Sequence, residues 1–344
     1  MNKYISYSKG IIKGHFLNKN IPLNITLCVT NRCNLRCIYC YEEYYDRNHK
    51  EFTTQEILSL IDELVSMGTK YISINGGEPL LRNDIGIIVD KIKEKNILSH
   101  ISTNGLLIKN NISVVRKFNS VAISIDGGKE STDNNRGKGV YDKLIEAFEC
   151  LKENNIKFHT QTVLTKNNKN AVDEIMSLAL KYKFDAQFSP LRCEDSPSKN
   201  ISLSDDELKE ITKKIIKYKK SGLPIFYSGE AYKNILNWPF SYDKQIILDE
   251  IPKNYEAVKC YIKRFACHIE ANGLVYPCIV LVNKFKALNL LEVGFKKAWE
   301  NLLDNNCKAC YNVCCNDFNL IFGFNIKVLL NAINIALGRI FHKI

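Results

Sequence analysis

Three cysteines near the start of the chain, Cys33, Cys37 and Cys40, have the spacing C-x3-C-x2-C. An alternating apolar run over residues 23–29 precedes them and predicts a strand that leads into their loop. Iron–sulfur clusters are usually held by four cysteine thiolates, so three thiolates leave one iron of a cubane without a protein ligand. An open coordination position is where a metal site does chemistry. The spacing therefore predicts a reactive iron–sulfur cluster.

A helix would explain the same spacing differently. Cysteines at i, i+4 and i+7 lie on one helical face, where they could be three small buried thiols. However, Asn31, Asn34 and Arg36 lie in the same segment, which has no apolar stripe of helix length. The metal site is the favoured interpretation.

Polar and glycine-rich segments follow the next three predicted strands as well. These segments are 76–79 (Gly-Gly-Glu-Pro), 102–105 (Ser-Thr-Asn-Gly) and 126–128 (Asp-Gly-Gly). The carboxyl ends of parallel strands meet at one edge of a sheet, where ligands bind. Glycines there let the backbone approach a ligand closely, and Glu78 or Asp126 can accept from an amine or a ribose hydroxyl.

Strands and helices alternate through the first 190 residues or so. This pattern predicts the α/β class, with an open, partial (β/α)6 barrel of parallel strands and a small C-terminal cysteine-rich α+β domain. The six strands are expected at residues 23–29, 71–75, 97–102, 121–125, 157–163 and 184–189. The expected boundaries are 1–20 for an N-terminal extension, 21–200 for the barrel, 201–256 for a helical connector, 257–317 for the cysteine-rich domain and 318–344 for an amphipathic tail.

Composition excludes several classes of protein. A chain of 344 residues with 45% hydrophobic and 25% charged residues is ordinary for a globular protein, and no run of 18 uncharged apolar residues occurs. The first residues lack a signal-peptide pattern, so the thirteen cysteines indicate metal ligands or thiols in a reducing compartment, the cytoplasm. The net charge of +11 comes without an aromatic–basic motif, so no nucleic-acid partner is expected.

Seven cysteines cluster between residues 260 and 315. Their spacing is Cys260-x6-Cys267-x10-Cys278, with a hairpin turn at Gly273, and then Cys307-x2-Cys310-x3-Cys314-Cys315. Four such cysteines could hold an iron–sulfur cluster or form a zinc ribbon. The isolated Cys28, Cys150 and Cys193 are expected to be core residues.

With these residues assembled, the chain resembles the radical S-adenosylmethionine superfamily. The C-x3-C-x2-C spacing with Tyr39 before the last cysteine is its signature, and Gly-Gly-Glu-Pro resembles its motif for the methionine amino group. The resemblance implies contacts to the ribose and adenine from 103–105 and 124–127, and to the cofactor carboxylate from Arg136. The implied cofactor-binding residues are Tyr39, Gly76, Gly77, Glu78, Pro79, Thr103, Asn104, Ser124, Asp126 and Arg136.

The resemblance also implies the chemistry. A [4Fe–4S] cluster on Cys33, Cys37 and Cys40 would cleave S-adenosylmethionine reductively, and the 5′-deoxyadenosyl radical would remove hydrogen from a substrate. An electron donor such as flavodoxin or ferredoxin is implied as a partner. The barrel would then position the reactants and exclude water.

The second cysteine region resembles the SPASM/twitch extension, which holds auxiliary iron–sulfur clusters. The implied ligands are Cys260, Cys278 and at least two of Cys307, Cys310 and Cys314, whereas Cys267 is equally compatible with a packed thiol. The longer cysteine run of a complete SPASM domain is missing, and no cysteine follows Cys315. One auxiliary cluster is therefore expected.

Many relatives with this extension mature ribosomal peptides, which favours a peptide or protein substrate by analogy. About 20 residues precede the first strand, too few for a fused leader-recognition domain, so a separate leader-binding protein is expected. The apolar, acid-free tail predicts a helix that packs on the barrel or lies on a membrane surface. A lipid or small metabolite is the alternative substrate, and a non-catalytic iron–sulfur or zinc protein in electron transfer is the alternative class.

Overall fold

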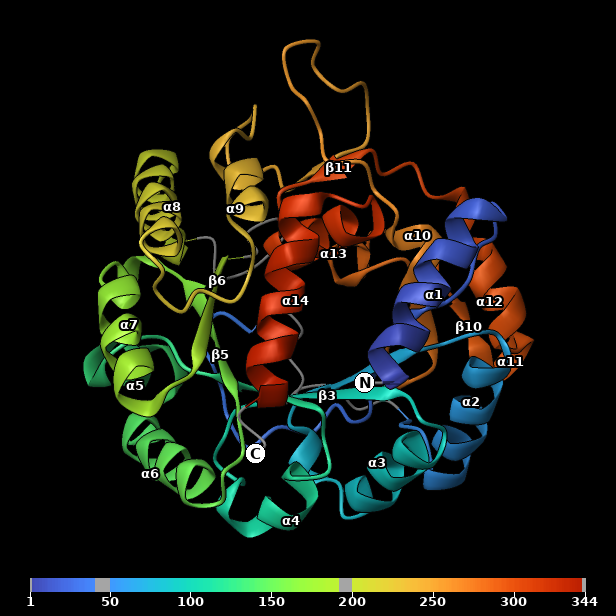
Figure 1. Cartoon of the computed structure of the whole chain (residues 1–344), viewed down its shortest axis with the longest axis horizontal. Coiled ribbons are helices and arrows are strands. Elements are labelled where there is room, and N and C mark those ends of the chain that lie inside the picture. Colours follow the sequence, from blue (N-terminus) through green and yellow to red (C-terminus); the bar gives the residue numbers. More distant parts are fainter. Residues whose placement is uncertain (1, 41–49, 192–199, 342–344) are drawn as a thin grey trace. The chain divides into compact units, whose positions relative to one another are not determined.

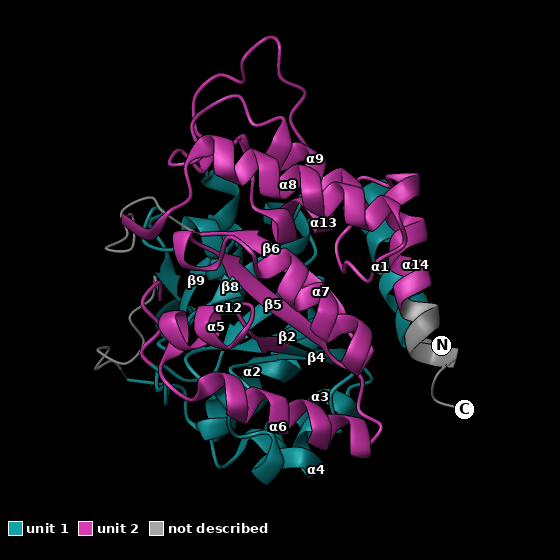
Figure 2. Cartoon of the chain, turned by 90° about the vertical axis from the view of Figure 1, so that its left-hand side faces the viewer, with its two compact units in different colours: residues 1–35, 42–122, 261–305 teal, residues 36–41, 123–260, 306–344 magenta. Residues whose placement is uncertain are grey.

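The computed structural model describes residues 2–40, 50–191 and 200–341. Cys193, which we expected to be a core residue, lies outside these residues. The chain divides into two compact units, each discontinuous in sequence (Figure 2). Unit 1 contains residues 1–35, 42–122 and 261–305, and unit 2 contains residues 36–41, 123–260 and 306–344.

Within the described residues, the larger sheet has nine strands, hydrogen-bonded in the order β10-β9-β8-β1-β2-β3-β4-β5-β6. Figure 1 labels many of the helices and strands, coloured along the chain. Strand β4 (Ser120–Ser124) runs across the boundary between the units. The other strands of unit 1 are β1 (Asn24–Cys28), β2 (Tyr71–Asn75), β3 (Leu98–Thr103), β8 (Ala266–Ile269), β9 (Leu274–Tyr276) and β10 (Leu288–Asn289). Those of unit 2 are β5 (His159–Leu164) and β6 (Asp185–Pro190), with β7 (Ile246–Ile247) and β11 (Ala309–Cys310) in a second, two-stranded sheet.

The helices follow the alternation that the sequence predicts. In unit 1 they are α1 (Asn2–Phe16), α2 (Thr54–Ser66), α3 (Ile85–Glu94), α4 (Ile112–Val115), α10 (Ile262–Phe265), α11 (Leu290–Val293) and α12 (Phe295–Asn301). In unit 2 they are α5 (Lys129–Arg136), α6 (Val140–Glu153), α7 (Ala171–Tyr182), α8 (Asp205–Lys220), α9 (Gly229–Leu236), α13 (Val313–Phe322) and α14 (Ile326–Phe341).

The predicted α/β class is confirmed, and all six predicted strands are present as β1 to β6. Strand β1 is central, because it pairs in parallel with β2 on one side and with β8 on the other. Its side chains are correspondingly buried, with Ile25 and Leu27 at 1% and 0% exposure. The strand that leads to the cysteine loop is therefore held from both sides.

Helix α2 was predicted correctly because its sequence carries both a capping box and an apolar period. Thr53 accepts a hydrogen bond from the backbone of Glu56, and the Glu56 side chain accepts one from the backbone of Thr53. This capping box starts α2, whose apolar residues at helical spacing are buried. They are Ile57, Leu60, Ile61 and Leu64.

Helix α1 was not predicted, and its two glycines explain why. A Cβ on Gly10 would lie 2.6 Å from Cδ2 of Leu23, and one on Gly14 would lie 2.3 Å from Cε1 of Phe265. Glycine is unfavourable in a helix but permits this close packing. Helix α5 was missed for another reason, since its sequence, Lys-Glu-Ser-Thr-Asp-Asn-Asn-Arg, has no apolar period.

The C-terminal tail is helical, as predicted. Ile326, Leu330 and Ile333 of α14 are exposed, whereas Val328 is buried. In the described part of the chain, no one helix has the length and apolar character to cross a membrane. Helices α13 and α14 meet the length and composition criteria only as a pair, which is bent by 107°.

Candidate active site

The Gly-Gly-Glu segment after β2 lies directly against the backbone that precedes Cys33. The N–H of Gly77 donates to the carbonyl of Thr30 at 2.9 Å, and the N–H of Glu78 donates to the carbonyl of Arg32 at 2.8 Å. A Cβ on Gly76 would lie 2.4 Å from the carbonyl oxygen of Thr30. Only glycine fits there, and Gly76 also has a φ of +138°. This explains the glycines beside the cysteine loop.

The carboxylate of Glu78 is fully buried and joins two loops. Its Oε1 accepts from the backbone of Leu80 at 3.0 Å and from Oγ1 of Thr103 at 2.8 Å, and its Oε2 accepts from the backbone of Asn104 at 2.7 Å. Burial raises the pKa of Glu78 to about 7, although these donors oppose the shift. A carboxylate has about four acceptor positions, so a further donor such as an amine can be accommodated.

Asn104 connects this carboxylate to the cysteine loop. Its Nδ2 donates to Oδ1 of Asn34 at 2.7 Å and lies 3.9 Å from Sγ of Cys33. The sequence analysis singled out Glu78, Thr103 and Asn104 from separate strand ends, and unit 1 brings them together beside Cys33. Pro79 is buried at the start of a short 3-10 helix over Pro79–Leu81, and it begins the turn that follows Glu78.

Two charged residues that support the loop escaped the sequence analysis. Glu51 accepts from Oγ1 of Thr30 at 3.0 Å and from the backbone of Asn31 at 2.6 Å. Arg82 donates to the carbonyls of Val29 and Phe52 at 2.8 and 2.9 Å. Neither belongs to a recognisable motif, and only the fold shows that these charges are buried or half-buried.

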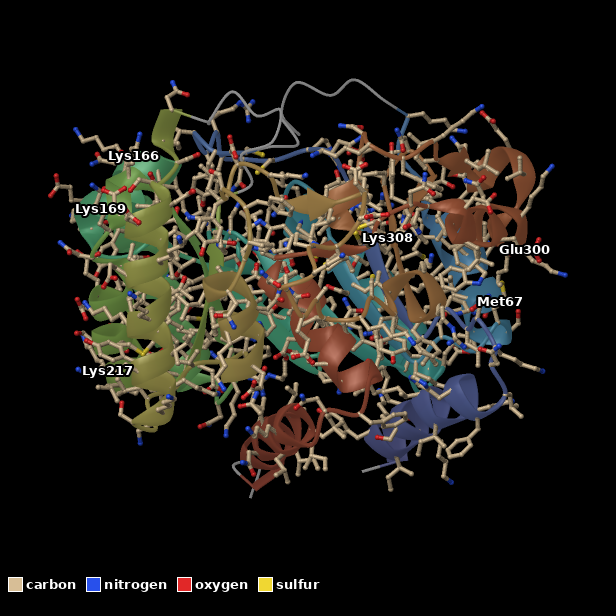
Figure 3. All side chains as sticks on the ribbon, turned by 90° about the horizontal axis from the view of Figure 1, so that it is seen from above. Met67, Lys166, Lys169, Lys217, Glu300 and Lys308 are labelled. Atoms are coloured by element: carbon tan, nitrogen blue, oxygen red, sulfur yellow. The ribbon has the colours of Figure 1, made fainter. Side chains whose placement is uncertain are left out.

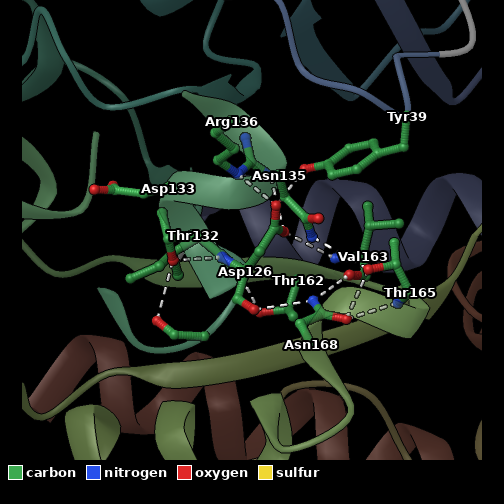
Figure 4. A network of polar contacts seen from close by, with 12 residues as sticks. Tyr39, Asp126, Thr132, Asp133, Asn135, Arg136, Thr162, Val163, Thr165 and Asn168 are labelled. Carbon is green, nitrogen blue, oxygen red and sulfur yellow. Dashed lines mark hydrogen bonds and ion pairs between the residues drawn. The ribbon is translucent and has the colours of Figure 1, made fainter. Parts of the chain in front are cut away.

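In unit 2, Asp126 forms a buried network with two residues that we expected to contact the cofactor (Figure 4). Oη of Tyr39 donates to Asp126 Oδ2 at 2.7 Å, and Nη2 of Arg136 donates to Asp126 Oδ1 at 3.1 Å. The guanidinium carbon of Arg136 also lies 5.5 Å from the centre of the Tyr39 ring. Burial raises the pKa of Tyr39 well above its usual range, so its hydroxyl remains a donor.

Neighbouring amides fix the loop that carries Asp126. Nδ2 of Asn168 donates to the carbonyls of Asp126 and Val163, at 2.9 and 2.8 Å. The N–H of Ile38, inside the cysteine motif, donates to the carbonyl of Asn135 at 3.0 Å. Helix α5 and the ends of β4 and β5 therefore hold the second half of the motif.

The sequence analysis did not predict the contacts among the members of this network. The sequence analysis assigned Tyr39, Asp126 and Arg136 to the cofactor, and the structure shows in addition that they contact one another. Ser124 lies at the end of β4, two residues before Asp126. Direct contacts of these four residues with a cofactor stay predictions.

No disulfide joins the twelve cysteines of the described residues. Cys33, Cys37 and Cys40 are each partly exposed and so accessible to a metal. Cys37 also packs against a small buried cluster formed by Tyr39 and Leu191. The partly exposed thiols and the glycine backbone beside them fit a cluster that binds an amino-acid cofactor.

The second cysteine region is divided between the units. In unit 2, the carbonyl of Cys310 accepts from Nδ2 of Asn234 at 3.1 Å and from Nδ2 of Asn316 at 3.0 Å. Cys314 lies in the first turn of α13 and hydrogen-bonds with the buried Tyr227. Cys260 and Cys307 of unit 2 and Cys278 of unit 1 are also partly exposed.

Cys267, which was compatible with a ligand or a packed thiol, is buried in β8 with 3% exposure. Burial raises the pKa of this thiol far above its usual value. Strands β8 and β9 form the predicted hairpin, with Gly273 at its turn in the left-handed region, at a φ of +92°.

The raised pKa of Glu78 predicts a pH dependence of stability. The folded carboxyl stays protonated up to about pH 7, whereas an unfolded one ionises near 4.5. Its contribution is therefore fully present below pH 4.5 and is lost as the pH rises to 7, a loss of about 3–3.5 kcal/mol in the free energy of unfolding. Urea unfolding of the cluster-free protein at several pH values measures it.

Glu78→Gln cannot titrate and should remove this decline. Glu56→Gln is the matched control, because the backbone hydrogen bond from Thr53 lowers the pKa of Glu56, and the decline should persist in it. Equal declines in Glu78→Gln and the wild type would contradict the assignment.

The buried network around Asp126 should contribute to the stability of unit 2. Asp126→Asn leaves the buried Arg136 without its counter-charge and should lower the free energy of unfolding by about 3–5 kcal/mol. Tyr39→Phe removes one hydrogen bond to a charged group and should cost about 1.5–3 kcal/mol. Urea unfolding of the purified variants gives both values.

An exposed ion pair of unit 2 provides the control. Lys169 lies at the surface, where it pairs with Glu207 (Figure 3). Glu207→Gln keeps the helix cap and should leave stability nearly unchanged, because exposed pairs contribute little. An Asp126→Asn variant no less stable than Glu207→Gln would rule out the buried network.

Comparisons with known proteins agree with this geometry. The model of the radical SAM superfamily matches residues 27–179. Mycofactocin maturase MftC of Mycobacterium tuberculosis (strain ATCC 25618 / H37Rv) is 31% identical over 298 residues, which cover 81% of this chain and 71% of the relative. GTP 3′,8-cyclase of Clostridium perfringens (strain SM101 / Type A) is 32% identical over 219 residues, which cover 60% of this chain and 67% of the relative.

A solved structure shows the same fold. SuiB of Streptococcus suis, bound to the precursor peptide SuiA, matches with a TM-score of 0.65 and 20% identity over 85% of this chain and 67% of SuiB. The expected partial-barrel fold is thereby confirmed. From its sequence relatives, its cysteine motif and its fold, the chain belongs to the radical SAM superfamily, and it is an enzyme that uses a [4Fe–4S] cluster and S-adenosylmethionine.

Proposed function

We propose that this radical SAM enzyme modifies a side chain of a peptide or protein. Cys33, Cys37 and Cys40 would hold the cluster, which with S-adenosylmethionine supplies an organic radical that removes hydrogen from the substrate. Glu78 would accept from the methionine amino group at its remaining lone pair, and Asn104 would position the cofactor beside Cys33. The single observation that carries these roles is the hydrogen-bonded connection from Glu78 through Asn104 to the cysteine loop.

The residues of unit 2 would position the other half of the motif. Tyr39, Asp126 and Arg136 hold one another, and Asn135 holds Ile38, so the loop needs little rearrangement when the cofactor binds. Ser124, at the end of β4, would face the ribose and adenine side. An electron donor such as flavodoxin or ferredoxin would supply the electron, in the reducing cytoplasm.

A pocket in unit 2 supports a side chain as the substrate. It measures about 300 Å³ and lies at the carboxyl ends of β5 and β6, where Leu164, Pro190 and Leu191 contribute to its wall. Leu191 also forms a buried cluster with Tyr39, and Cys37 packs against this cluster, so the pocket adjoins the cysteine loop. This volume is at the lower limit for small-molecule sites and suits one inserted side chain.

Relatives favour a peptide as well. The name of MftC identifies a maturase, and SuiB is bound to a precursor peptide in its crystal structure. An auxiliary cluster on Cys260, Cys278 and at least two of Cys307, Cys310 and Cys314 would lie in the cysteine-rich region, which we expect over residues 257–317. Cys314 is at the N-terminus of α13, where the helix dipole favours a thiolate ligand.

The proposed cluster ligands are tested on protein that is reconstituted anaerobically with iron and sulfide. With dithionite and S-adenosylmethionine, the wild type should release 5′-deoxyadenosine, and Cys37→Ala should release none, because its cluster lacks one of three ligands. Liquid chromatography measures the product, and iron analysis measures the cluster. Cys150→Ala, on α6, is the control that should retain activity. Equal product from Cys37→Ala would contradict the ligand assignment.

The substrate is tested by co-expressing the enzyme with short peptides encoded beside its gene and measuring their mass. Ser202→Phe fills the pocket and should abolish the mass change while 5′-deoxyadenosine is still released. Ser221→Phe, at the exposed end of α8, should change neither. Undiminished peptide modification by Ser202→Phe would exclude this pocket.

The exposed apolar face of α14 supports a second proposal, a peripheral contact with a membrane and a lipid or small-metabolite substrate there. Ile326, Leu330 and Ile333 are 74%, 55% and 51% exposed, and residues 318–344 contain no acidic residue. Such a helix favours anionic lipid surfaces.

Sedimentation with anionic lipid vesicles tests this contact. The wild type should sediment, and a variant with Ile326→Glu and Leu330→Glu should not, because the changes place charge on the apolar face. Ser221→Glu is the control for added charge elsewhere. A wild type that stays in the supernatant, or a double variant that sediments equally, would rule out the contact.

A further inference from the structure

Three buried side chains of unit 1 place a thiol, an imidazole and a carboxylate together. They are Cys28, at the end of β1, and His268 and Glu270, in and just after β8. Their exposures are 0%, 1% and 2%. The three potential ligand atoms all lie within 4.8 Å of one another. None of these residues has a part in the cofactor site described above.

The pairing of the strands explains why they meet. Strands β1 and β8 are parallel, with Thr26 opposite His268 and Leu27 opposite Ile269. Continuing this register places Cys28 opposite Glu270. Side chains alternate along a strand, so His268 and Glu270 share one face of the sheet with Cys28. The cluster is therefore built into the central pairing of the fold.

The contacts converge on one nitrogen. Nε2 of His268 lies 2.6 Å from Oε1 of Glu270 and 3.7 Å from Sγ of Cys28. In a nucleophile–base–carboxylate arrangement the thiol and the carboxylate face opposite nitrogens of the ring. Here both face Nε2, and Nδ1 is buried without a hydrogen-bond partner in the described residues. A proton relay through the ring is thus excluded, whereas three atoms directed at one point match a metal site.

Charge and ligand type identify the metal. A buried carboxylate is costly unless it is paired or binds a metal. A divalent cation with one thiolate, one carboxylate and a neutral imidazole makes a group with no net charge. Cysteine sulfur, histidine nitrogen and glutamate oxygen are together typical of zinc, which takes four ligands in a tetrahedron. A water molecule would provide the fourth.

We propose that Cys28, His268 and Glu270 bind a zinc-like divalent metal ion, separate from the iron–sulfur clusters. The site would join β1 to β8 and so tie residues 266–270 to the strand that leads to Cys33. The 2.6 Å separation of Nε2 and Oε1 would lengthen when the ion binds between them, to the spacing of adjacent tetrahedral ligands.

Zinc analysis of the full chain tests the proposal. The protein is reconstituted with iron and sulfide, incubated with zinc chloride and dialysed. The wild type should retain about one zinc ion per chain, and His268→Gln and Cys28→Ser should each lose it. Cys150→Ser and Cys267→Ser are the matched controls that should keep it. Zinc in His268→Gln at the wild-type level would overturn the proposal.

X-ray absorption at the zinc edge on the wild type covers the case in which a variant fails to fold. One sulfur with nitrogen and oxygen neighbours is the expected ligand set. Four sulfur neighbours would instead place the zinc at the cysteine-rich region, and no retained zinc would exclude a site. Either of these results would overturn the proposal.

Discussion

The buried carboxylate of Glu78 is the interaction on which the first half of the site depends. It accepts hydrogen bonds from Leu80, in the turn that follows it, and from Thr103 and Asn104, at the end of β3. The backbone N–H of Glu78 donates to the carbonyl of Arg32. A charged group in this position would be costly without its donors. The donors that offset the cost of burying the carboxylate also fix the two loops beside Cys33.

The second half of the motif is organised by a different carboxylate. Asp126 compensates the charge of Arg136 and accepts from Tyr39, which lies inside the cysteine motif. Each unit therefore holds its portion of the loop through one buried acid at the end of a strand. The hydrogen-bond partners described for each acid belong to its own unit, so each acid holds the part of the motif that its unit contains.

The motifs and strands were predictable because they depend on local patterns. Glycine–glycine–glutamate and three cysteines are visible in the sequence, and so is the apolar period of β1 to β6. The pairing of Asp126 with Arg136 was not predictable, because residues ten apart meet only through the turn and helix α5, which has no apolar period. The supports from Glu51 and Arg82, and the meeting of Cys28 with His268, depend on tertiary pairing that no local pattern records.

The position of β1 between β2 and β8 also constrains the order of events during synthesis. Strand β8 and Ala271, whose carbonyl accepts a hydrogen bond from the backbone of Phe52, belong to unit 1. They are synthesised about 240 residues after β1, with which β8 pairs. Residues 123–260 leave the ribosome before unit 1 can be completed. Domains generally fold as units during translation, but here one edge of β1 stays unpaired until β8 arrives. Iron inserted at Cys33 before then would enter a loop whose supporting strand is still incomplete.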